Sequence, residues 1–271
     1  MLLTNKRALV MGVANNRSIA WGIARALHRE GAQVAFTYQS DRLKENLVGL
    51  LADVGGADAY PMFKCDVASD DDIAATFEGI RAAWGGLDTL VHCLAFAGRD
   101  ELSRAFSDIT RQGYVQALDI SAYSLIRCAA AAKPLFVAAG GGSIMTLTYN
   151  AADRVVPSYG VMAIAKAALE CEVRYLTSDL GPLNVRVNAI SAGAIRTLAA
   201  SAVKGISGFR DAIEAVAPLR RNVTQEEVGD VAVFLASDLS RSVTGNTLFV
   251  DGGFHVMGAA GAAEVREKAG T

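Results

Sequence analysis

Two tyrosines and a lysine stand at spacings that suit chemistry on a carbonyl-type oxygen. Tyr149 lies ten residues before Tyr159, and Lys166 lies seven residues after it. Seven steps of about 100° make close to two helical turns, so one helix face can present both Tyr159 and Lys166. A phenol near an ammonium group can donate a hydrogen bond to a developing oxyanion. Alone, such a pair is more often a core edge and a solvated charge, so the interpretation depends on a cofactor site nearby.

A strand that runs into a glycine and then a helix supplies the candidate cofactor site. The apolar segment from Arg7 to Met11 is followed by Gly12, and Ser18 stands where the next helix begins. Free N–H groups and the helix dipole at such a start favour a dinucleotide's diphosphate. The GxGxxG spacing is absent, because Gly12 and Gly22 are the only glycines in this stretch. A capped helix after a turn is the alternative.

Two polar residues follow the next two strands. Gln39 ends the second strand, where a carboxylate commonly meets a ribose hydroxyl and an arginine meets a 2′-phosphate. Gln39 is neutral, Asp41 would repel a 2′-phosphate, and Arg42 is the counter-argument, so NADH is expected over NADPH. Asp66 closes the third strand, where its carboxylate either accepts from an adenine amino group or caps a turn.

The elements that position these residues alternate between apolar strands and longer helices. Strands are expected over residues 7–11, 34–38, 59–64, 87–93, 142–147, 185–190 and 247–250, and helices over 18–30, 41–51, 70–84, 112–137, 158–180 and 225–235. A bend is expected before Pro134. Buried, non-alternating strands linked by helices predict an α/β fold, a Rossmann-type doubly wound parallel seven-stranded sheet with helices on both faces.

The chain reads as one domain over residues 1–258. No Pro- or Ser-rich linker divides it. Residues 197–218 interrupt the rhythm and contain Gly205 and Gly208, which favour a mobile insertion with hinges over a stiff core helix. Residues 259–271 are expected to form a flexible tail.

Composition excludes several classes of protein. An apolar fraction of 52 % with 20 % charged residues is incompatible with a disordered chain. A net charge of −2 disfavours nucleic-acid binding. Four dispersed cysteines without CxxC spacing predict neither a metal site nor a disulfide framework. No signal peptide or membrane-spanning run is evident, so a cytoplasmic protein without a membrane partner is expected.

Taken together, these features resemble the short-chain dehydrogenase/reductase superfamily, from Asn5 to Phe254. Within it, the sequence is similar to the NADH-dependent bacterial enoyl-acyl-carrier-protein reductases that triclosan inhibits. The matching motifs are Gly12-x5-Ser18-Ile19-Ala20, Tyr149-x9-Tyr159-x6-Lys166, Asn188-Ala189-Ile190-Ser191-Ala192-Gly193 with Ile195-Arg196-Thr197-Leu198-Ala199, and Asp251-Gly252-Gly253-Phe254.

The tyrosine spacing discriminates within the superfamily. Carbonyl-reducing members carry Tyr-x3-Lys, with a serine thirteen residues before that tyrosine. The corresponding positions here hold Met162 and Tyr149. This departure favours the enoyl reductase over a carbonyl (3-oxoacyl) reductase of the same superfamily. A non-catalytic dinucleotide-binding regulator is the third hypothesis.

The resemblance implies a reaction and a set of site residues. NADH would deliver hydride to the β-carbon of a trans-2-enoyl thioester in type II fatty acid biosynthesis. Tyr159 would hold the resulting enolate oxygen, Lys166 would bind the cofactor ribose, and Tyr149 would border the acyl chain. The cofactor would be lined by Gly12, Ser18, Ile19, Gln39, Asp66, Val67, Leu94, Lys166, Ile195, Arg196, Thr197, Leu198 and Ala199, and the substrate by Ala97.

The resemblance also implies partners. Acyl carrier protein would bring the substrate, and the alanine-rich helices would pack in a homotetramer. Residues 197–218 would form a lid over the cofactor and the acyl chain. Four basic residues in and just beyond this segment, Lys204, Arg210, Arg220 and Arg221, would dock an acidic carrier protein, although ordinary solvated charges are the alternative.

Overall fold

The computed structural model describes residues 1–197 and 206–258 and is organised around one parallel sheet. Its strands are β1 (Arg7–Met11), β2 (Gln33–Tyr38), β3 (Met62–Lys64), β4 (Thr89–His92), β5 (Gly142–Thr148), β6 (Val185–Ala192) and β7 (Thr247–Val250). They lie in the order β3-β2-β1-β4-β5-β6-β7, and every pairing is parallel. The predicted Rossmann-type, doubly wound fold is confirmed, with its switch point between β1 and β4.

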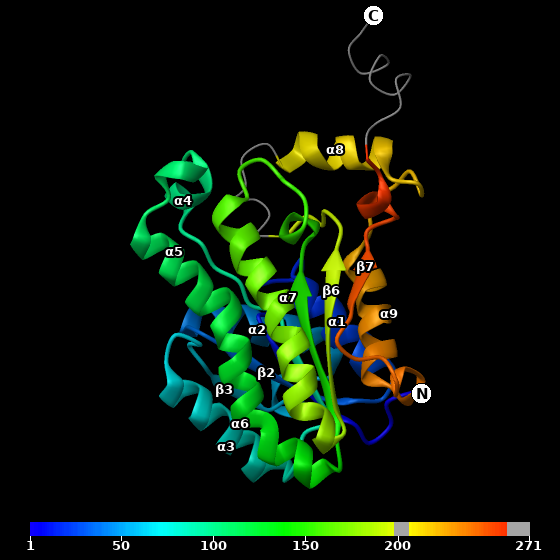
Figure 1. Ribbon diagram of the computed structural model, residues 1–271. Coiled ribbons are helices and arrows are strands. Elements are labelled where there is room, and N and C mark those ends of the chain that lie inside the picture. Colours follow the sequence, from blue (N-terminus) through cyan, green and yellow to red (C-terminus); the bar gives the residue numbers. More distant parts are fainter. Residues whose placement is uncertain (198–205, 259–271) are drawn as a thin grey trace, which may run out of the picture.

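Helices cover both faces of the sheet (Figure 1). On one face, α1 (Ile19–Arg29), α2 (Asp41–Leu51) and α9 (Gln225–Ala236) share a buried apolar core with the strands. On the other face, α3 (Asp70–Trp84), α6 (Ser124–Ala139) and α7 (Gly160–Leu180) form a second core. The helix starts follow capping rules, since Ser69 accepts from the Asp72 N–H and Thr224 forms a capping box with Glu227.

The long helix expected over residues 112–137 has three parts. It comprises α5 (Arg111–Leu118), a π-helix η4 (Asp119–Tyr123) and α6, which continues through Pro134. The departure from α-helical geometry therefore lies at η4, well before Pro134 in the chain, and α6 remains an α-helix at Pro134 itself. Among the described residues, the stretch Arg111–Ala139 is the one helix long and apolar enough to cross a membrane, and half of its most apolar window is buried in the protein.

Short helices fill several connections. They are η1 (Ala52–Val54), η2 (Ala57–Ala59), α4 (Arg99–Ser103), η3 (Phe106–Asp108), η5 (Asn150–Ala152), η6 (Gly181–Leu183), η8 (Asp238–Ser240) and η9 (Phe254–Val256). The predicted start of the third strand at residue 59 was wrong, because η2 occupies that segment and β3 begins at Met62.

At the end of the sheet to which the strand arrows point lie α4 and α8 (Ile206–Val216) (Figure 1). The expectation of hinges in place of a helix was wrong for residues 206–216. Buried Ile213 and Ala217 pack with Ala194 in a small apolar cluster, which gives α8 a reason to be helical. Residues 198–205, with Gly205, lie outside the described part.

Candidate active site

The segments that follow β1 and β4 meet at the switch point. Gly12, the first residue after β1, lies where they meet. Gly12 has a φ of +95°, and a Cβ there would come within 2.1 Å of the Cys93 carbonyl oxygen. Only glycine permits this approach and this conformation. The structure therefore brings the turn after β1 into direct contact with the loop that starts at Cys93.

The start of α1 presents two N–H groups without a partner in the part of the chain that the structure describes. The amides of Ile19 and Ala20 have no acceptor among the described residues. Ser18 Oγ accepts from the N–H groups of Ala14 and Asn15 at 3.0 Å each, which leaves its own proton free to donate. Free amides at a helix start beside a glycine turn are the donors that a diphosphate requires. The residues present therefore fit a dinucleotide cofactor.

The residues expected near the adenosine pair with one another. Gln39 Nε2 donates to Asp66 Oδ2 at 3.0 Å. The other oxygen of Asp66 accepts from the Ala68 N–H at 3.1 Å, so Asp66 also caps the turn after β3. Val67 packs against the second core. These three residues lie together at the carboxyl ends of β2 and β3.

Lys166 is a buried cation on α7. Its side chain is 5 % exposed, and its Nζ donates to the Leu147 carbonyl oxygen of β5 at 2.7 Å. Burial lowers the pKa of Lys166 from 10.5 to about 8. Burial also raises the pKa of the nearby Cys93 thiol to about 12, so that thiol stays neutral. Within residues 1–197 and 206–258 the Lys166 ammonium is thus held by one backbone carbonyl, which leaves its other protons for a ligand.

Tyr149 and Tyr159 face each other edge to face, with ring centroids 5.2 Å apart. Burial raises the pKa of Tyr159 to about 12. The pKa of Tyr149 is raised further, by burial first and then by Tyr159 and Asp251. Both phenols therefore remain protonated donors at neutral pH.

Tyr159 is the N-cap of α7, one residue before the helix, and not inside it as predicted. The preceding residue, Ser158, has a φ of +60°. A serine rarely adopts this left-handed conformation, and strain of this kind is concentrated at functional sites. The turn at Ser158 therefore sets the direction in which the chain enters α7 at Tyr159.

The loop after β4 reaches the same region. Ala97 and Tyr159 both pack against a small cluster of buried residues, which comprises Leu102, Ala117, Val161, Met162 and Ala165. Leu94 packs instead against the second core, closer to the sheet. The loop thus runs from the switch point, at Cys93, to the surroundings of Tyr159, at Ala97.

Residues beyond β6 close the other side of the switch point. Ile195 packs on the first core together with Ile19 and Cys93, and the Thr197 N–H donates to the Ile195 carbonyl oxygen at 2.9 Å. Arg196 is exposed. The predicted cofactor residues Leu198 and Ala199 lie outside the described residues.

The basic residues expected to dock a partner are largely engaged within the chain. Arg210 Nε donates to the Ala194 carbonyl oxygen at 3.0 Å, and Arg221 pairs with Glu227 at 2.6 Å. Arg220 donates to the Ala215 carbonyl oxygen. Lys204 is outside the described residues. Arg210 is therefore bound to Ala194, two residues beyond the end of β6, and is not a free surface charge.

Two residues at the site were missed in the sequence. Asp251 accepts from the N–H groups of Gly253 and His255, at 2.9 and 2.8 Å, and it contributes to the raised pKa of Tyr149. The Asp-Gly-Gly sequence that begins at Asp251 was the feature from which a turn at this position could have been predicted. Ser121 lies in the π-helix and binds the loop after β4, and no local pattern marks a π-turn.

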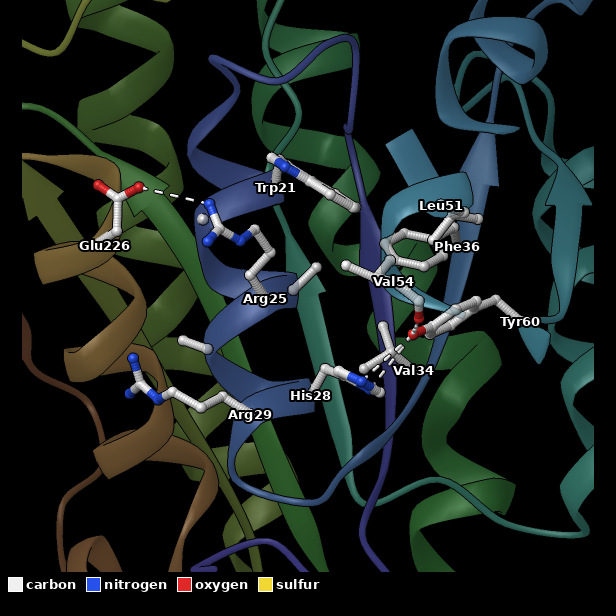
Figure 2. Close-up of a pocket in the computed structure, with 13 residues that line it drawn as sticks. Trp21, Arg25, His28, Arg29, Val34, Phe36, Leu51, Val54, Tyr60 and Glu226 are labelled. Atoms are coloured by element: carbon white, nitrogen blue, oxygen red, sulfur yellow. Dashed lines mark hydrogen bonds and ion pairs between the residues drawn. The ribbon is translucent and has the colours of Figure 1, made fainter. Parts of the chain in front are cut away.

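A cavity of about 250 Å³ lies away from this site, beside α1 (Figure 2). Its walls include the aromatic residues Trp21, Phe36 and Tyr60, together with Arg25 and Arg29. None of the catalytic candidates lines it. Within residues 1–197 and 206–258, no group of three or more His, Cys, Asp or Glu side chains is arranged to hold a metal ion.

Comparisons with known proteins agree with this geometry. The family model described as Enoyl-(Acyl carrier protein) reductase matches residues 12–255. An enoyl-[acyl-carrier-protein] reductase [NADH] of a Nostoc species is 53 % identical over 94 % of this chain and 98 % of its own length. A homologue of the same name from Bacillus subtilis is 46 % identical over 94 % of this chain and 97 % of its own length.

Solved structures give the same result. The Bacillus cereus enoyl-acyl carrier protein reductase, solved with NADP⁺ and an indole naphthyridinone, is 50 % identical, covers 95 % of this chain and 99 % of its own, and superposes with a TM-score of 0.92. The Anaplasma phagocytophilum enzyme, solved with NAD, is 41 % identical over 97 % of this chain and 98 % of its own, with a TM-score of 0.91. This chain belongs to the enoyl-(acyl carrier protein) reductase family.

Proposed function

We propose that the site around Tyr149, Tyr159 and Lys166 reduces the trans-2 double bond of enoyl thioesters with NADH, as a step of fatty acid synthesis. The observation that carries the proposal is an edge-to-face pair of protonated tyrosines at the start of α7, with a buried lysine seven residues beyond Tyr159 on the same helix, at the carboxyl end of the sheet. Family membership and relatives named as NADH-dependent enoyl reductases support the same reaction.

The cofactor lies across the switch point in this proposal. Its diphosphate binds at the amides of Ile19 and Ala20, beside Gly12 and Ser18. Its adenosine lies near Gln39 and Asp66. Among the described residues, the remaining wall is formed by Val67, Leu94, Lys166, Ile195, Arg196 and Thr197. NADH supplies the hydride when bound, and Gln39 offers no charge to a 2′-phosphate, so NADH is preferred over NADPH.

Tyr159 stabilises the negative charge that forms on the thioester oxygen. Its hydroxyl donates one hydrogen bond to that oxygen, and its pKa of about 12 keeps the proton on Tyr159 at neutral pH. Lys166 binds the cofactor ribose through the protons that Leu147 does not use. Tyr149 borders the acyl chain opposite Tyr159, and Ala97 contacts the substrate from the loop after β4.

Carbonyl reduction is the competing activity. Its tyrosine would stand four residues before Lys166, where this chain has Met162, and Met162 is buried in the cluster beneath Tyr159. A rate assay separates the two activities. With NADH, crotonyl thioester should be turned over and acetoacetyl thioester should not; the reverse preference would identify a carbonyl reductase.

The wider assignments follow from this activity. Acyl carrier protein presents the substrate, and the enzyme works as a cytoplasmic homotetramer. The lid expected over residues 197–218 includes residues 198–205, which lie outside the described residues. Because Arg210 donates to the Ala194 carbonyl oxygen, it supports α8 and contributes little to docking of the carrier protein.

A further inference from the structure

Ser121 forms two hydrogen bonds to one residue of the loop after β4. Its Oγ accepts from the Phe96 N–H at 2.9 Å and donates to the Phe96 carbonyl oxygen at 3.2 Å. Ser121 itself is 0 % exposed. A single buried hydroxyl therefore satisfies both backbone polar groups of Phe96, in a loop that has no neighbouring strand to do so.

The π-helix η4 explains how Ser121 reaches this loop. A π-turn inserts an extra residue into a helix and is frequent at functional sites. Ser124, at the start of α6, donates to the Ile120 carbonyl oxygen at 2.7 Å, and its Oγ lies 2.8 Å from Nε2 of His92. His92 is the last residue of β4. The helical segment 120–124 thus holds the loop at two points, at His92, just before it begins, and at Phe96 within it.

The same segment contacts the catalytic helix. Ser121 Oγ lies 3.8 Å from Sδ of Met162, which is three residues beyond Tyr159 on α7. Ala97, the residue after Phe96, packs against the cluster that also supports Tyr159. Ser121 therefore joins the acyl side of the site, at Ala97, to the helix that begins at Tyr159.

We propose that Ser121 is a positioning residue for enoyl reduction, which holds Phe96 and Ala97 at a fixed distance from Tyr159. The proposal rests on the placement of the acyl chain beside Ala97 given above. Ser121 acts through the Phe96 backbone and contacts neither substrate nor cofactor. Without its hydroxyl, two backbone groups lose their partners, the loop shifts, and the double bond is no longer presented correctly.

Ser121→Ala tests the proposal through a split between substrate and cofactor. The KM for crotonyl thioester should rise about tenfold, while the Kd for NADH stays within about twofold. Ser143→Ala is the matched control. Ser143 is also buried and donates to one carbonyl oxygen, that of Leu235, but Ser143 lies at the start of β5, at the opposite end of the strand from the site. Ser143→Ala should leave both constants unchanged. Ser121→Thr, which keeps the hydroxyl, should have a KM close to that of the wild type.

Hydrogen exchange gives a direct readout of the contact. Exchange of the Phe96 amide should accelerate in Ser121→Ala and not in Ser143→Ala. An unchanged KM in folded Ser121→Ala overturns the proposal, whether or not the exchange rate changes. If Ser121→Ala does not fold, Ser121→Cys, with a similar size and a weak donor, must show the raised KM, and a normal KM there overturns the proposal.

A variant at Ala97 separates the positioning role of Ser121 from the proposal that the acyl chain lies beside Ala97. Ala97→Val adds bulk where the acyl chain is placed and should raise the KM for crotonyl thioester. If Ala97→Val raises the KM and Ser121→Ala does not, the positioning role of Ser121 is wrong and the acyl placement stands. If neither variant changes the KM, the acyl placement is wrong as well.

Discussion

At the scale of single residues, Lys166 is a buried ammonium group, and burial favours its neutral form. Its pKa is lowered to about 8, so in the free enzyme the ammonium is lost as pH rises through that value. Binding should weaken as the proton is lost, because only the protonated form carries a charge and has three donors, one for Leu147 and two for the cofactor ribose.

The affinity for NADH should therefore fall as pH rises from 7 to 9, by up to about tenfold. Fluorescence titration of NADH across this range measures it. In Lys166→Met the affinity should be low and independent of pH. A wild-type affinity that is flat from pH 7 to 9 would contradict the role of Lys166.

Tyr159 is the residue whose loss should affect the rate most. Tyr159→Phe keeps the ring against Tyr149 and removes one oxyanion donor, which is worth roughly 10²-fold in kcat. Steady-state kinetics with crotonyl thioester should show that fall with a near-normal Kd for NADH. Turnover at the wild-type rate would remove Tyr159 from the mechanism.

At the scale of elements, periodicity located most helices and strands, and α2, α3 and β7 were predicted with the bounds that the structure has. The conformation of segments that depend on tertiary contacts could not be predicted from the sequence. The π-helix at Asp119–Tyr123 is set by its packing on α7, and α8 is set by the contact of Ile213 with Ala194. Likewise, the pairing of Gln39 with Asp66 joins two loops that are 27 positions apart in the chain.

The turn before α7 links stability and activity. Ser158 adopts a left-handed conformation that glycine tolerates without strain. Ser158→Gly should stabilise the fold by about 0.5–1 kcal/mol, after the entropic cost of glycine is subtracted from the strain. It should also lower kcat a few-fold, because Tyr159 loses its fixed approach to α7.

Thermal unfolding together with steady-state kinetics tests this link. Ser158→Val is the control, since a β-branched residue is poorly tolerated at this φ and should destabilise the protein. A lower unfolding temperature for Ser158→Gly than for the wild type would show that the serine is not strained.

At the scale of the whole molecule, apolar side chains remain exposed on the helices of one face. They include Val115, Ile126, Val137 and Tyr175, from 37 % to 76 % exposed, on α5, α6 and α7. Exposed apolar side chains on neighbouring helices are typical of an interface. We expect a homotetramer with two-fold axes, because such faces pair with themselves.

Light scattering at micromolar concentration should give four times the chain mass of 28.4 kDa. Tyr175→Glu should lower that mass, and Tyr38→Phe, a change at the end of β2 away from these helices, should not. A monomeric mass for the unaltered protein would contradict the assembly.

The reaction itself is tested most directly by following the hydride into the product. NADH labelled with deuterium at the transferable position is incubated with crotonyl thioester, and the product is analysed by mass spectrometry and NMR. The account predicts butyryl thioester with one deuterium at the β-carbon and none at the α-carbon. A parallel incubation uses acetoacetyl thioester in place of crotonyl thioester. If deuterium appears only at the carbinol carbon of that second product, and none enters the product from crotonyl thioester, enoyl reduction is contradicted.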